Sequence, residues 1–393
     1  MNGKRVGIIG GSIAGCAAAI VLRRAGCDVT VFERSAGALR DRGHGVSFPV
    51  EVRNELEAEG LIDARAPAQF IAERYWFARD GDAPLGRLLW RQSMHGASHN
   101  WGMLWANLRD RLDGADYRDG LPVTGIEPGA DAVTLRLGDG TAERFDVVLG
   151  ADGYQSMARA FVDPAATPHH AGYVLWRGGY PITEVPEPIP DALRHQSSSV
   201  VYSGGHGVMM LIPAPHPPGL RVYWAVYHRT AQSLSPGLGA VTGDRLHGLD
   251  DLLTDHFPPY WREIIARTER NTTLVHPVVD VRMSQYAAQR IALIGDAATV
   301  VRPHAGSGAV KAVQDALALG RLHREHRDWD TVLAAYDAER RPAGNALVDL
   351  GERIGQAQVT STPSWTTMTP GDFDAWMRSI LAGGRLYLYD LEK

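Results

Sequence analysis

Two apolar runs separated by a helical pattern open the chain, and this order predicts a β-α-β unit over residues 4–34. We expect a short buried strand at residues 6–9, an alanine-rich helix at residues 14–24, and a second strand at residues 28–32 that ends in Glu33. A glycine-rich turn joins the first strand to the helix. The unit is typical of the start of a doubly wound α/β domain.

The stretch from Val6 to Leu22 carries no charge, so a signal peptide or a short membrane span is the alternative. Its glycines and serine divide it into a strand, a turn and a helix, and Arg23 and Arg24 stand where a cleavage site needs small residues. No other stretch of the sequence is long and apolar enough to cross a bilayer. We therefore expect a cytoplasmic protein with no membrane partner.

Two later apolar runs, residues 144–149 and residues 290–294, are each followed by Gly and Asp. Buried parallel strands meet ligands at their carboxyl ends, so both runs fit further strands of the same core. Residues 133–140 predict a strand and a hairpin turn. Residues 169–271 carry short strand-like segments separated by proline-rich connections, which predicts a mostly antiparallel sheet inserted into the first domain.

Composition and charge exclude several classes of partner. The net charge is −5 and no run of Lys or Arg is present, so we expect no nucleic-acid surface. The two cysteines, Cys16 and Cys27, form neither a CxxC motif nor a Cys/His cluster with metal-ligand spacing, so we expect no metal site. Their low number fits a reducing compartment and argues against a disulfide scaffold.

The first chemical motif is the turn from Gly10 to Gly15. Such a turn lets the backbone approach a pyrophosphate, and the helix N-terminus that follows favours negative charge. Glu33 offers a carboxylate to ribose hydroxyls, while Ser12 stands where a glycine is usual but is still small. The alternative is a plain packing turn. Strand, helix and acid together favour a dinucleotide that contains ADP, without separating FAD from NAD.

Two further motifs follow the two later strands. Asp152 precedes a glycine and stands seven positions before Arg159, although an Asp-Gly pair by itself is more often just a turn. Asp296 ends the last strand, where it can accept hydrogen bonds from a polyol chain. Gly306 and Gly308 let the backbone wrap around a flat ring, and the helix that starts there points its positive end at that ring. A reduced flavin carries negative charge, which this helix end would stabilise.

With these three motifs in this order, the chain resembles the class A flavoprotein aromatic hydroxylases, which have the p-hydroxybenzoate hydroxylase fold. The resemblance covers most of residues 1–350. It implies that the first motif holds the FAD pyrophosphate and ribose, that Asp152 and Arg159 belong to an FAD- and nicotinamide-binding motif, and that Asp296 contacts the ribityl region. Residues 173–178, and residues 302–306 together with Lys311 and Ala312, are similar to the subgroup that contains 2,6-dihydroxypyridine 3-monooxygenase.

The fold class that follows is α/β: a Rossmann-like FAD-binding domain with an inserted, mostly antiparallel β-sheet substrate domain and C-terminal helices. We assign residues 1–74, 100–168 and 272–352 to the FAD-binding domain, residues 75–99 and 169–271 to the substrate domain, and residues 353–393 to a C-terminal helical extension. Helices are predicted over residues 309–325 and 331–357.

The chain departs from the family pattern at two positions. Thr299 stands where the third motif usually continues with His, and Ala106 stands where the helix after Trp101 usually carries an Arg that contacts FAD. Arg109, about one helical turn later, and Arg42 are the candidates to replace that Arg at the pyrophosphate.

The resemblance implies an enzyme in which NADPH or NADH reduces FAD, O2 forms a flavin C4a-hydroperoxide, and one oxygen atom reaches an electron-rich ring such as a phenol or hydroxypyridine. A general base would activate the ring, and a closed apolar pocket between the inserted sheet and the flavin would exclude water. His304 and His206 are the candidate proton movers, although a single His on a sheet is more often a packed residue.

The expected contacts fall into three groups. The expected cofactor-binding residues are Gly10, Ser12, Ile13, Ala14, Gly15, Glu33, Arg34, Arg42, Gly45, Arg109, Asp152, Asp296, Gly306, Gly308 and Ala309. The expected substrate-binding residues are Met210, Trp224, Tyr227 and Pro303, and the expected catalytic residues are His304 and His206. The expected partners are FAD, NADPH or NADH, O2 and a small aromatic substrate, and an oligomer is left open.

Two alternatives remain open at this point. An NAD-dependent dehydrogenase or a nucleotide-binding sensor would use the β-α-β unit but leave the other two motifs unexplained. A family member with different flavin chemistry, such as an epoxidase or an oxidative decarboxylase, fits all three motifs. A halogenase does not, because the sequence lacks a Trp-x-Trp-x-Ile-Pro motif.

We predict that the purified protein is yellow with non-covalently bound FAD. Glu33→Ala should weaken FAD retention by about 1.5–3 kcal/mol, because the ribose hydroxyls lose a charged acceptor. Equilibrium titration of flavin fluorescence with both proteins measures the difference. A colourless protein that takes up no added FAD would contradict the prediction.

Overall fold

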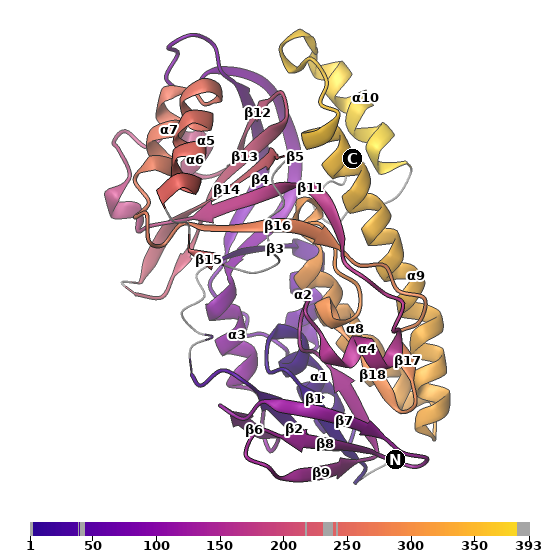
Figure 1. The fold of residues 1–393 in the computed structure, drawn as a ribbon. Coiled ribbons are helices and arrows are strands. Elements are labelled where there is room, and N and C mark those ends of the chain that lie inside the picture. The colour runs from indigo at the N-terminus through magenta and orange to yellow at the C-terminus, as the bar shows by residue number, and fades with distance from the viewer. Residues whose placement is uncertain are drawn as a thin grey trace.

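The computed structural model describes residues 3–37, 39, 44–216, 218–230, 239–240 and 243–382. A six-stranded sheet and a small three-stranded sheet form the lower half of the molecule in Figure 1, and a nine-stranded sheet forms the upper half. This is the expected α/β architecture, with a doubly wound nucleotide-binding domain and a mostly antiparallel second sheet.

The six-stranded sheet has the order β17-β18-β10-β1-β2-β6, and all neighbours are parallel except β17 and β18. Its strands are β1 (Arg5–Ile9), β2 (Asp28–Glu33), β6 (Asp116–Asp119), β10 (Val147–Gly150), β17 (Ala287–Ala288) and β18 (Ile291–Leu293). Helices α1 (Ile13–Arg24) and α8 (Gly308–Glu325) follow β1 and β18, and their buried apolar faces share one core with the sheet. The carboxyl ends of β1, β10 and β18 therefore lie side by side.

The predicted single strand at residues 144–149 is wrong, because Asp146 divides it between two sheets. Residues before it belong to the three-stranded sheet of β7 (Val123–Pro128), β8 (Val133–Leu137) and β9 (Ala142–Phe145), and residues after it form β10. The Asp146 carboxylate accepts a hydrogen bond from the Arg5 backbone N–H at 2.8 Å, which fixes the turn against β1. Residues on both sides of Asp146 are extended, and only the register with neighbouring strands reveals the break.

The nine-stranded sheet has the order β15-β16-β11-β14-β13-β12-β4-β5-β3, and its one parallel pair among the described residues is β12 with β4. Its strands are β3 (Gly45–Pro49), β4 (Gln69–Ala78), β5 (Arg87–Asn100), β11 (His169–Gly178), β12 (Ser197–Tyr202), β13 (Gly205–Ala214), β14 (Gly219–Arg229), β15 (Gly239–Ala240) and β16 (Leu274–Asp280). It takes in residues 45–49, 69–74 and 274–280, which we had assigned to the FAD-binding domain, because β5 pairs with both β3 and β4 and β16 pairs with β11.

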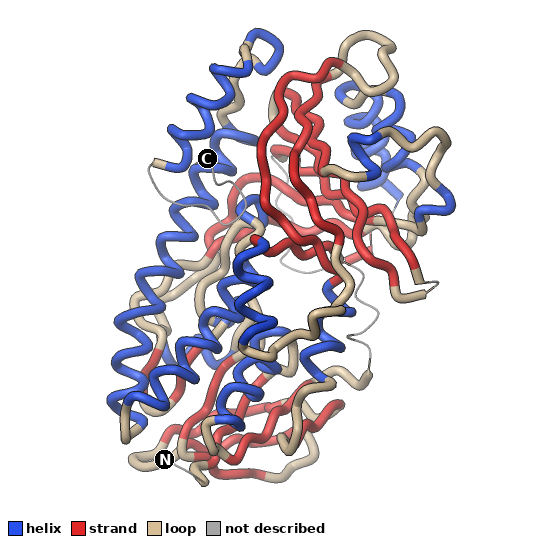
Figure 2. The backbone as a smooth tube through the Cα atoms, turned by 180° about the vertical axis from the view of Figure 1, so that it is seen from behind, coloured by secondary structure: helices blue, strands red, loops and turns tan. Residues whose placement is uncertain are grey.

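The two faces of the nine-stranded sheet have different neighbours. One face, which we call the outer face, packs Trp176, Met209 and Trp224 against α5 (Asp191–Arg194), α6 (Gly243–His256) and α7 (Pro259–Ala266), the helices beside the sheet at the upper right of Figure 2. The other face, the inner face, carries Tyr173 and Tyr227 and meets the turn before α8. Strand alternation assigns every side chain of the sheet to one face or the other.

The C-terminal helices join the two halves of the molecule. Helix α9 (Trp329–Gly355) runs along the right-hand side of Figure 1 past both large sheets. A π-helical turn (Gln356–Thr360) and α10 (Pro370–Leu381) follow, and Phe373 of α10 stacks on Trp90 of β5 at 5.5 Å. The predicted helical extension thus holds through α10, and residues 383–393 lie outside the described residues.

The remaining elements are short. They are α2 (Val50–Ala58), α3 (Trp101–Arg109), α4 (Met157–Val162) and the 3-10 turns Ile182–Glu184, Gly295–Ala297, Pro303–Ala305 and Trp365–Thr367. Among the described residues, no helix has the length and apolar character needed to cross a membrane.

Candidate functional site

The structure brings the three sequence motifs together at the carboxyl ends of β1, β10 and β18. A Cβ atom added to Gly10 would lie 2.4 Å from the backbone oxygen of Ala151, the residue before Asp152. A Cβ atom added to Gly295 would lie 3.0 Å from the Cβ of Ala14. The first motif therefore touches both of the others, as expected for one continuous ligand site at the end of a parallel sheet.

The turn from Gly10 to Gly15 has a fixed shape. Gly10 has φ +101°, a left-handed value, and a Cβ on Gly15 would lie 1.9 Å from the oxygen of Gly10, so both positions require glycine. The Gly11 carbonyl accepts hydrogen bonds from Trp105 Nε1 at 2.7 Å and from the Tyr117 hydroxyl at 3.1 Å. These bonds hold the turn from the side of α3 and β6.

Glu33 is buried at the end of β2, where its carboxylate accepts hydrogen bonds from the backbone N–H groups of Gly11 at 2.8 Å and Ser35 at 2.9 Å. The acid thereby joins the end of the second strand to the glycine-rich turn. This is the position expected for a ribose contact, since a carboxylate has lone pairs left for further donors.

Two helices point uncapped N-termini at this region. Ser12 is the N-cap residue of α1 and Ser307 that of α8, yet neither side chain makes a capping hydrogen bond. By contrast, Asn100, Asp328 and Thr369 cap α3, α9 and α10 with their side chains. The first N–H groups of α1 and α8 therefore keep their capacity to bind an anion, which the helix dipole also favours.

Arg159 braces the turn Gly295–Ala297 from the side of the second motif. Its buried guanidinium donates hydrogen bonds to the backbone oxygens of Asp296 at 2.5 Å, Ala297 at 3.0 Å and Tyr154 at 2.8 Å. Asp152 sits at the start of α4, where its carboxylate accepts from the Met157 N–H at 2.7 Å. In the described structure the second motif thus supports the third one.

A buried charged network braces the same turn from the side of α8. Lys311 donates to the Gly295 oxygen at 2.9 Å and to Asp315 at 2.8 Å, and Asp315 also accepts from the Gly295 N–H at 3.0 Å and from Arg340 of α9 at 2.8 Å. Burial acts to lower the pKa of Lys311, but Asp315 and other neighbours outweigh it and raise that pKa. The ammonium group therefore stays charged inside the protein.

The clamped turn presents Asp296. Its side chain is solvent-exposed, and the Lys311 and Arg159 cations lie near it. Gly306 follows with a left-handed φ of +61° and ends the 3-10 turn before α8. Asp296, Gly306 and the start of α8 at Gly308 and Ala309 thus line one region, as the third motif predicted.

His304 links this region to the inner face of the nine-stranded sheet. Its ring nitrogens share hydrogen bonds with the Tyr173 hydroxyl at 2.7 Å and with His206 Nε2 at 3.2 Å. Tyr227 lies against both histidines, with ring centroids 4.2 Å from His304 and 4.7 Å from His206. Both histidines are buried, so they are packed residues of the contact between the sheet and the turn.

Burial keeps both histidines neutral. It lowers the pKa of His206 to about 3, with a smaller effect from the Arg74 cation. Burial also lowers the pKa of His304 well below its usual value, and His206, Arg302 and Arg74 act in the same direction. Each ring therefore has one donor and one acceptor nitrogen near neutral pH.

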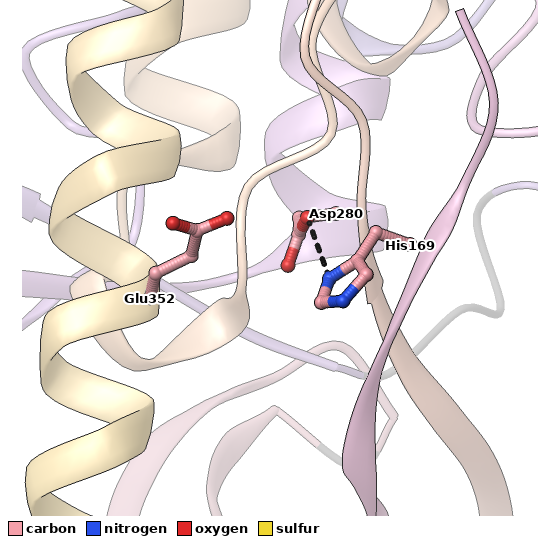
Figure 3. A group of neighbouring side chains, drawn as sticks. All are labelled: His169, Asp280 and Glu352. Carbon is pink, nitrogen blue, oxygen red and sulfur yellow. Dashed lines mark ion pairs between the residues drawn. The ribbon is translucent and has the colours of Figure 1, made fainter.

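Arg302 extends the contact to strand β16. It donates to the buried Asp280 carboxylate at 2.6 Å and places its guanidinium 5.8 Å from the centre of the Tyr173 ring. Figure 3 shows Asp280 with His169, at 3.4 Å, and Glu352 of α9 nearby. We propose no metal site there, because the Asp280 carboxylate already pairs with a cation and Arg302 would repel a second one.

The other expected substrate residues lie in different places. Met210 pairs with Tyr223 and His206 pairs with Tyr227 across β13 and β14, so all four share the inner face. Trp224 pairs with Met209, lies on the outer face and donates to the Thr268 hydroxyl at 2.6 Å. Trp224 is therefore not brought together with the others. The sequence pattern could not assign Trp224 to one face of the sheet, because both faces of β14 are largely apolar.

The remaining expected cofactor residues are placed as follows. Ile13 is buried at the start of α1, Arg34 is exposed beyond β2, Gly45 begins β3 under the Tyr223 ring, and the Arg109 guanidinium lies 3.9 Å from the centre of the Tyr117 ring. Pro303 is exposed at the start of its 3-10 turn. Arg42 lies outside the described residues.

Several supporting residues were missed from the sequence. Lys311 had counted only toward the resemblance to the subgroup, and its ion pair with Asp315 was not predicted. The available signal was their spacing of four positions on an otherwise apolar helix face. Trp105 and Tyr117 gave no signal, because their contacts with Gly11 depend on α3 and β6 folding over the turn.

Two family models match the chain. One is described as an FAD binding domain and matches residues 103–351, and the other is described as pyridine nucleotide-disulphide oxidoreductase and matches residues 5–61. Together they cover the three motifs and the helices that carry them.

Characterised relatives match over most of the chain. The 2,6-dihydroxypyridine 3-monooxygenase of Paenarthrobacter nicotinovorans is 26% identical over 366 residues, which cover 88% of this chain and 89% of that protein. The 2-heptyl-3-hydroxy-4(1H)-quinolone synthase of Pseudomonas aeruginosa is 30% identical over 328 residues, 80% of this chain and 79% of that protein. The solved structure of 2,6-dihydroxypyridine-3-hydroxylase from Arthrobacter nicotinovorans has the same fold, with a TM-score of 0.81, 23% identity, and coverage of 94% and 95%.

We predict that Asp315→Asn destabilises the protein by about 3–5 kcal/mol, because Lys311 and Arg340 lose their shared buried anion. FAD retention should fall with it, since Gly295 loses a fixed acceptor. Urea denaturation and flavin content after gel filtration measure both effects. The matched control is Asp330→Asn, whose exposed pair with Arg290 contributes about 0–1 kcal/mol. Equal losses in the two variants would contradict the role of the network.

The neutral histidines predict an acid-labile fold. Below the usual His pKa of 6.5, both histidines become protonated in the unfolded chain, whereas buried His206 and His304 stay neutral in the folded protein. Their contribution to the free energy of unfolding is therefore fully present above pH 6.5 and is lost as the pH falls. The expected slope is about 1.4 kcal/mol per pH unit for each histidine. His206→Gln should lose one such contribution between pH 6.5 and 4.5 in urea denaturation, whereas exposed His195→Gln should not. An unchanged slope in His206→Gln would mean that His206 titrates normally.

Proposed function

The chain belongs to the FAD-binding-domain family of class A flavin monooxygenases, and on this basis we propose that it hydroxylates an N-heteroaromatic ring that already carries a ring oxygen. It is an FAD-dependent enzyme. The overall reaction consumes NADPH or NADH, a proton and O2, places one oxygen atom on a ring carbon and releases the other as water. Two electrons from the nicotinamide and two from the C–H bond account for the four-electron reduction of O2.

Three features of the site fit FAD. The glycine-rich turn and the uncapped start of α1 offer backbone N–H groups to a pyrophosphate, and Glu33 lies where a ribose would follow. Asp296 is exposed at the end of β18, at the right place for a polyol chain. The Ser307 hydroxyl is buried without a hydrogen-bond partner among the described residues, at the uncapped start of α8. FAD would use all three motifs, whereas NAD bound at the first motif would leave the other two without a role.

The chemistry of oxygen transfer belongs to the bound FAD, which accepts hydride from the nicotinamide and activates O2. The protein's own contribution is position and electrostatics. The positive end of α8 would stabilise negative charge on a flavin held at this helix start. The charged network under Gly295 keeps that helix end in place, and the inner face of the nine-stranded sheet closes the site against water.

His304 couples the two parts of this site. It lies in the turn that leads into α8, and it makes hydrogen bonds to Tyr173 of the sheet and to His206. We expect it to hold the turn at the correct distance from a substrate bound on the inner face and to relay a proton between its two partners. Its contacts are with protein groups, so it is a positioning residue in this proposal.

The substrate class rests on the relatives. The names of two of them specify a dihydroxypyridine and a hydroxylated quinolone, both rings with nitrogen and oxygen substituents. The test is a panel of hydroxypyridines, quinolones and phenols, in which NADPH or NADH consumption and product mass are measured together. A product 16 mass units heavier than a hydroxypyridine or quinolone supports the proposal, and hydroxylation of phenols alone would contradict it.

We predict that His304→Ala lowers product yield per NAD(P)H consumed more than it lowers FAD binding. Without the His304 contacts the turn is no longer held to the sheet, so the substrate is positioned less well and a larger share of the NAD(P)H consumed should appear as hydrogen peroxide. Product, peroxide and NAD(P)H are measured in the same reaction. Tyr173→Phe, which removes only the hydroxyl partner, should show the same change in smaller degree.

Exposed His195→Ala is the control for this prediction and should behave as wild type. Unchanged coupling in His304→Ala, at any pH at which the enzyme is folded, would remove His304 from the mechanism.

A further inference from the structure

The backbone carbonyl of Gly11 accepts three side-chain hydrogen bonds, and the donors come from three different elements. Trp105 Nε1 of α3 donates at 2.7 Å, the Tyr117 hydroxyl of β6 at 3.1 Å, and the Cys16 thiol of α1 at 3.3 Å. A carbonyl oxygen has two lone pairs, so three donors exceed its ordinary capacity. The Gly11 N–H is already held by Glu33 at 2.8 Å, so this crowding of donors on one oxygen is more than the shape of the turn requires.

All three donors keep their hydrogen near neutral pH. Burial raises the pKa of the Cys16 thiol to about 12, against the opposing effect of Arg109. Burial also raises the pKa of the Tyr117 hydroxyl, and the indole N–H of Trp105 acts only as a donor. The Arg109 guanidinium lies 3.9 Å from the centre of the Tyr117 ring, where its charge draws electron density from the ring and makes the hydroxyl a better donor.

Gly11 permits this approach because it has no side chain. A Cβ atom added to Gly11 would overlap the hydroxyl and the ring of Tyr117. The contact between β6 and the turn therefore depends on the pairing of a glycine with a tyrosine, two residues that lie 106 positions apart.

The donors act on the next peptide N–H through the peptide group itself. In a trans peptide, the C=O and N–H bonds point in opposite directions and share delocalised electrons, so donors at the Gly11 oxygen leave the Ser12 N–H more positive. Hydrogen bonds that polarise one another in this way gain roughly 10–30% in strength per bond. Ser12 is the N-cap residue of α1, and its N–H belongs to the helix start that favours an anion.

We propose that Trp105, Tyr117 and Cys16 strengthen the Ser12 N–H as a donor to the FAD pyrophosphate, by polarising the Gly11–Ser12 peptide group. They act through that peptide and are positioning residues. The proposal rests on FAD binding at the first motif and is independent of the substrate proposed above, so failure of the one does not imply failure of the other.

The polarised peptide can be observed directly by NMR of the FAD-bound enzyme. The sequence contains two Gly-Ser pairs, Gly11–Ser12 and Gly306–Ser307, so glycine labelled with 13C at the carbonyl and serine labelled with 15N together mark only these two peptide groups. Ser307→Ala removes one of the two signals and thereby assigns both. The Gly306–Ser307 signal then serves as the internal control.

Binding is measured by competition, in which ADP or adenosine displaces FAD from the enzyme. ADP carries the pyrophosphate and adenosine does not, so the ratio of their affinities isolates the contribution of the phosphates. The variants are Tyr117→Phe, which removes one donor and keeps the ring beside Arg109, and Cys16→Ala, which removes another donor from the opposite side. The matched control is Tyr75→Phe, whose hydroxyl donates to Glu73 at 3.1 Å in the nine-stranded sheet.

Tyr117→Phe should lower the preference for ADP over adenosine by about two- to fivefold, because the bond to an anionic oxygen loses part of its cooperative strengthening. Cys16→Ala should lower it in the same direction by up to about twofold, since a thiol is a weak donor. The Gly11 carbonyl and Ser12 amide signals should shift in both variants while the Gly306–Ser307 signal stays in place. Tyr75→Phe should match wild type in both measurements.

Equal weakening of ADP and adenosine, or no weakening of either, would overturn the proposal and leave the three donors a purely structural role. A Gly11–Ser12 signal that moves no more than the Gly306–Ser307 signal would overturn it as well. So would a wild-type enzyme from which ADP displaces FAD no better than adenosine does, because the turn would then not bind the pyrophosphate.

Discussion

The site depends on the fixed backbone of Gly295–Ala297. Gly295 has a left-handed φ of +59°, and its N–H and C=O groups bond to Asp315 and Lys311, while Arg159 holds the next two carbonyls. A buried charge without its partner costs several kcal/mol. The folded protein therefore keeps these side chains in the one arrangement in which every charge is paired. The position of this turn then determines where Asp296 points and where α8 begins.

The same turn carries the link between the two sheets. His304 follows it by a few residues and is bonded to Tyr173, and Arg302 beside it is bonded to Asp280 of β16. The flavin-binding motif and the inner face of the nine-stranded sheet are therefore held at a fixed separation by polar contacts as well as by packing. Oxygen transfer requires such a separation, because a misplaced ring loses the reaction to peroxide release.

The sequence predicted those features that depend on local pattern. The β-α-β unit, the paired Gly-Asp strand ends and the antiparallel character of the insert are all set by periodicity and turn chemistry, and the structure has them. It did not predict the break at Asp146 or the outer-face position of Trp224, because both depend on register between strands distant in sequence.

The central claim is that this site transfers one oxygen atom from O2 to an aromatic ring. The direct measurement is mass spectrometry of the product formed from 2,6-dihydroxypyridine and NADPH or NADH under 18O2 in ordinary water. We expect a hydroxylated ring that carries one 18O atom. Consumption of NAD(P)H that yields only labelled hydrogen peroxide, or a product oxygen that comes from water, would contradict it.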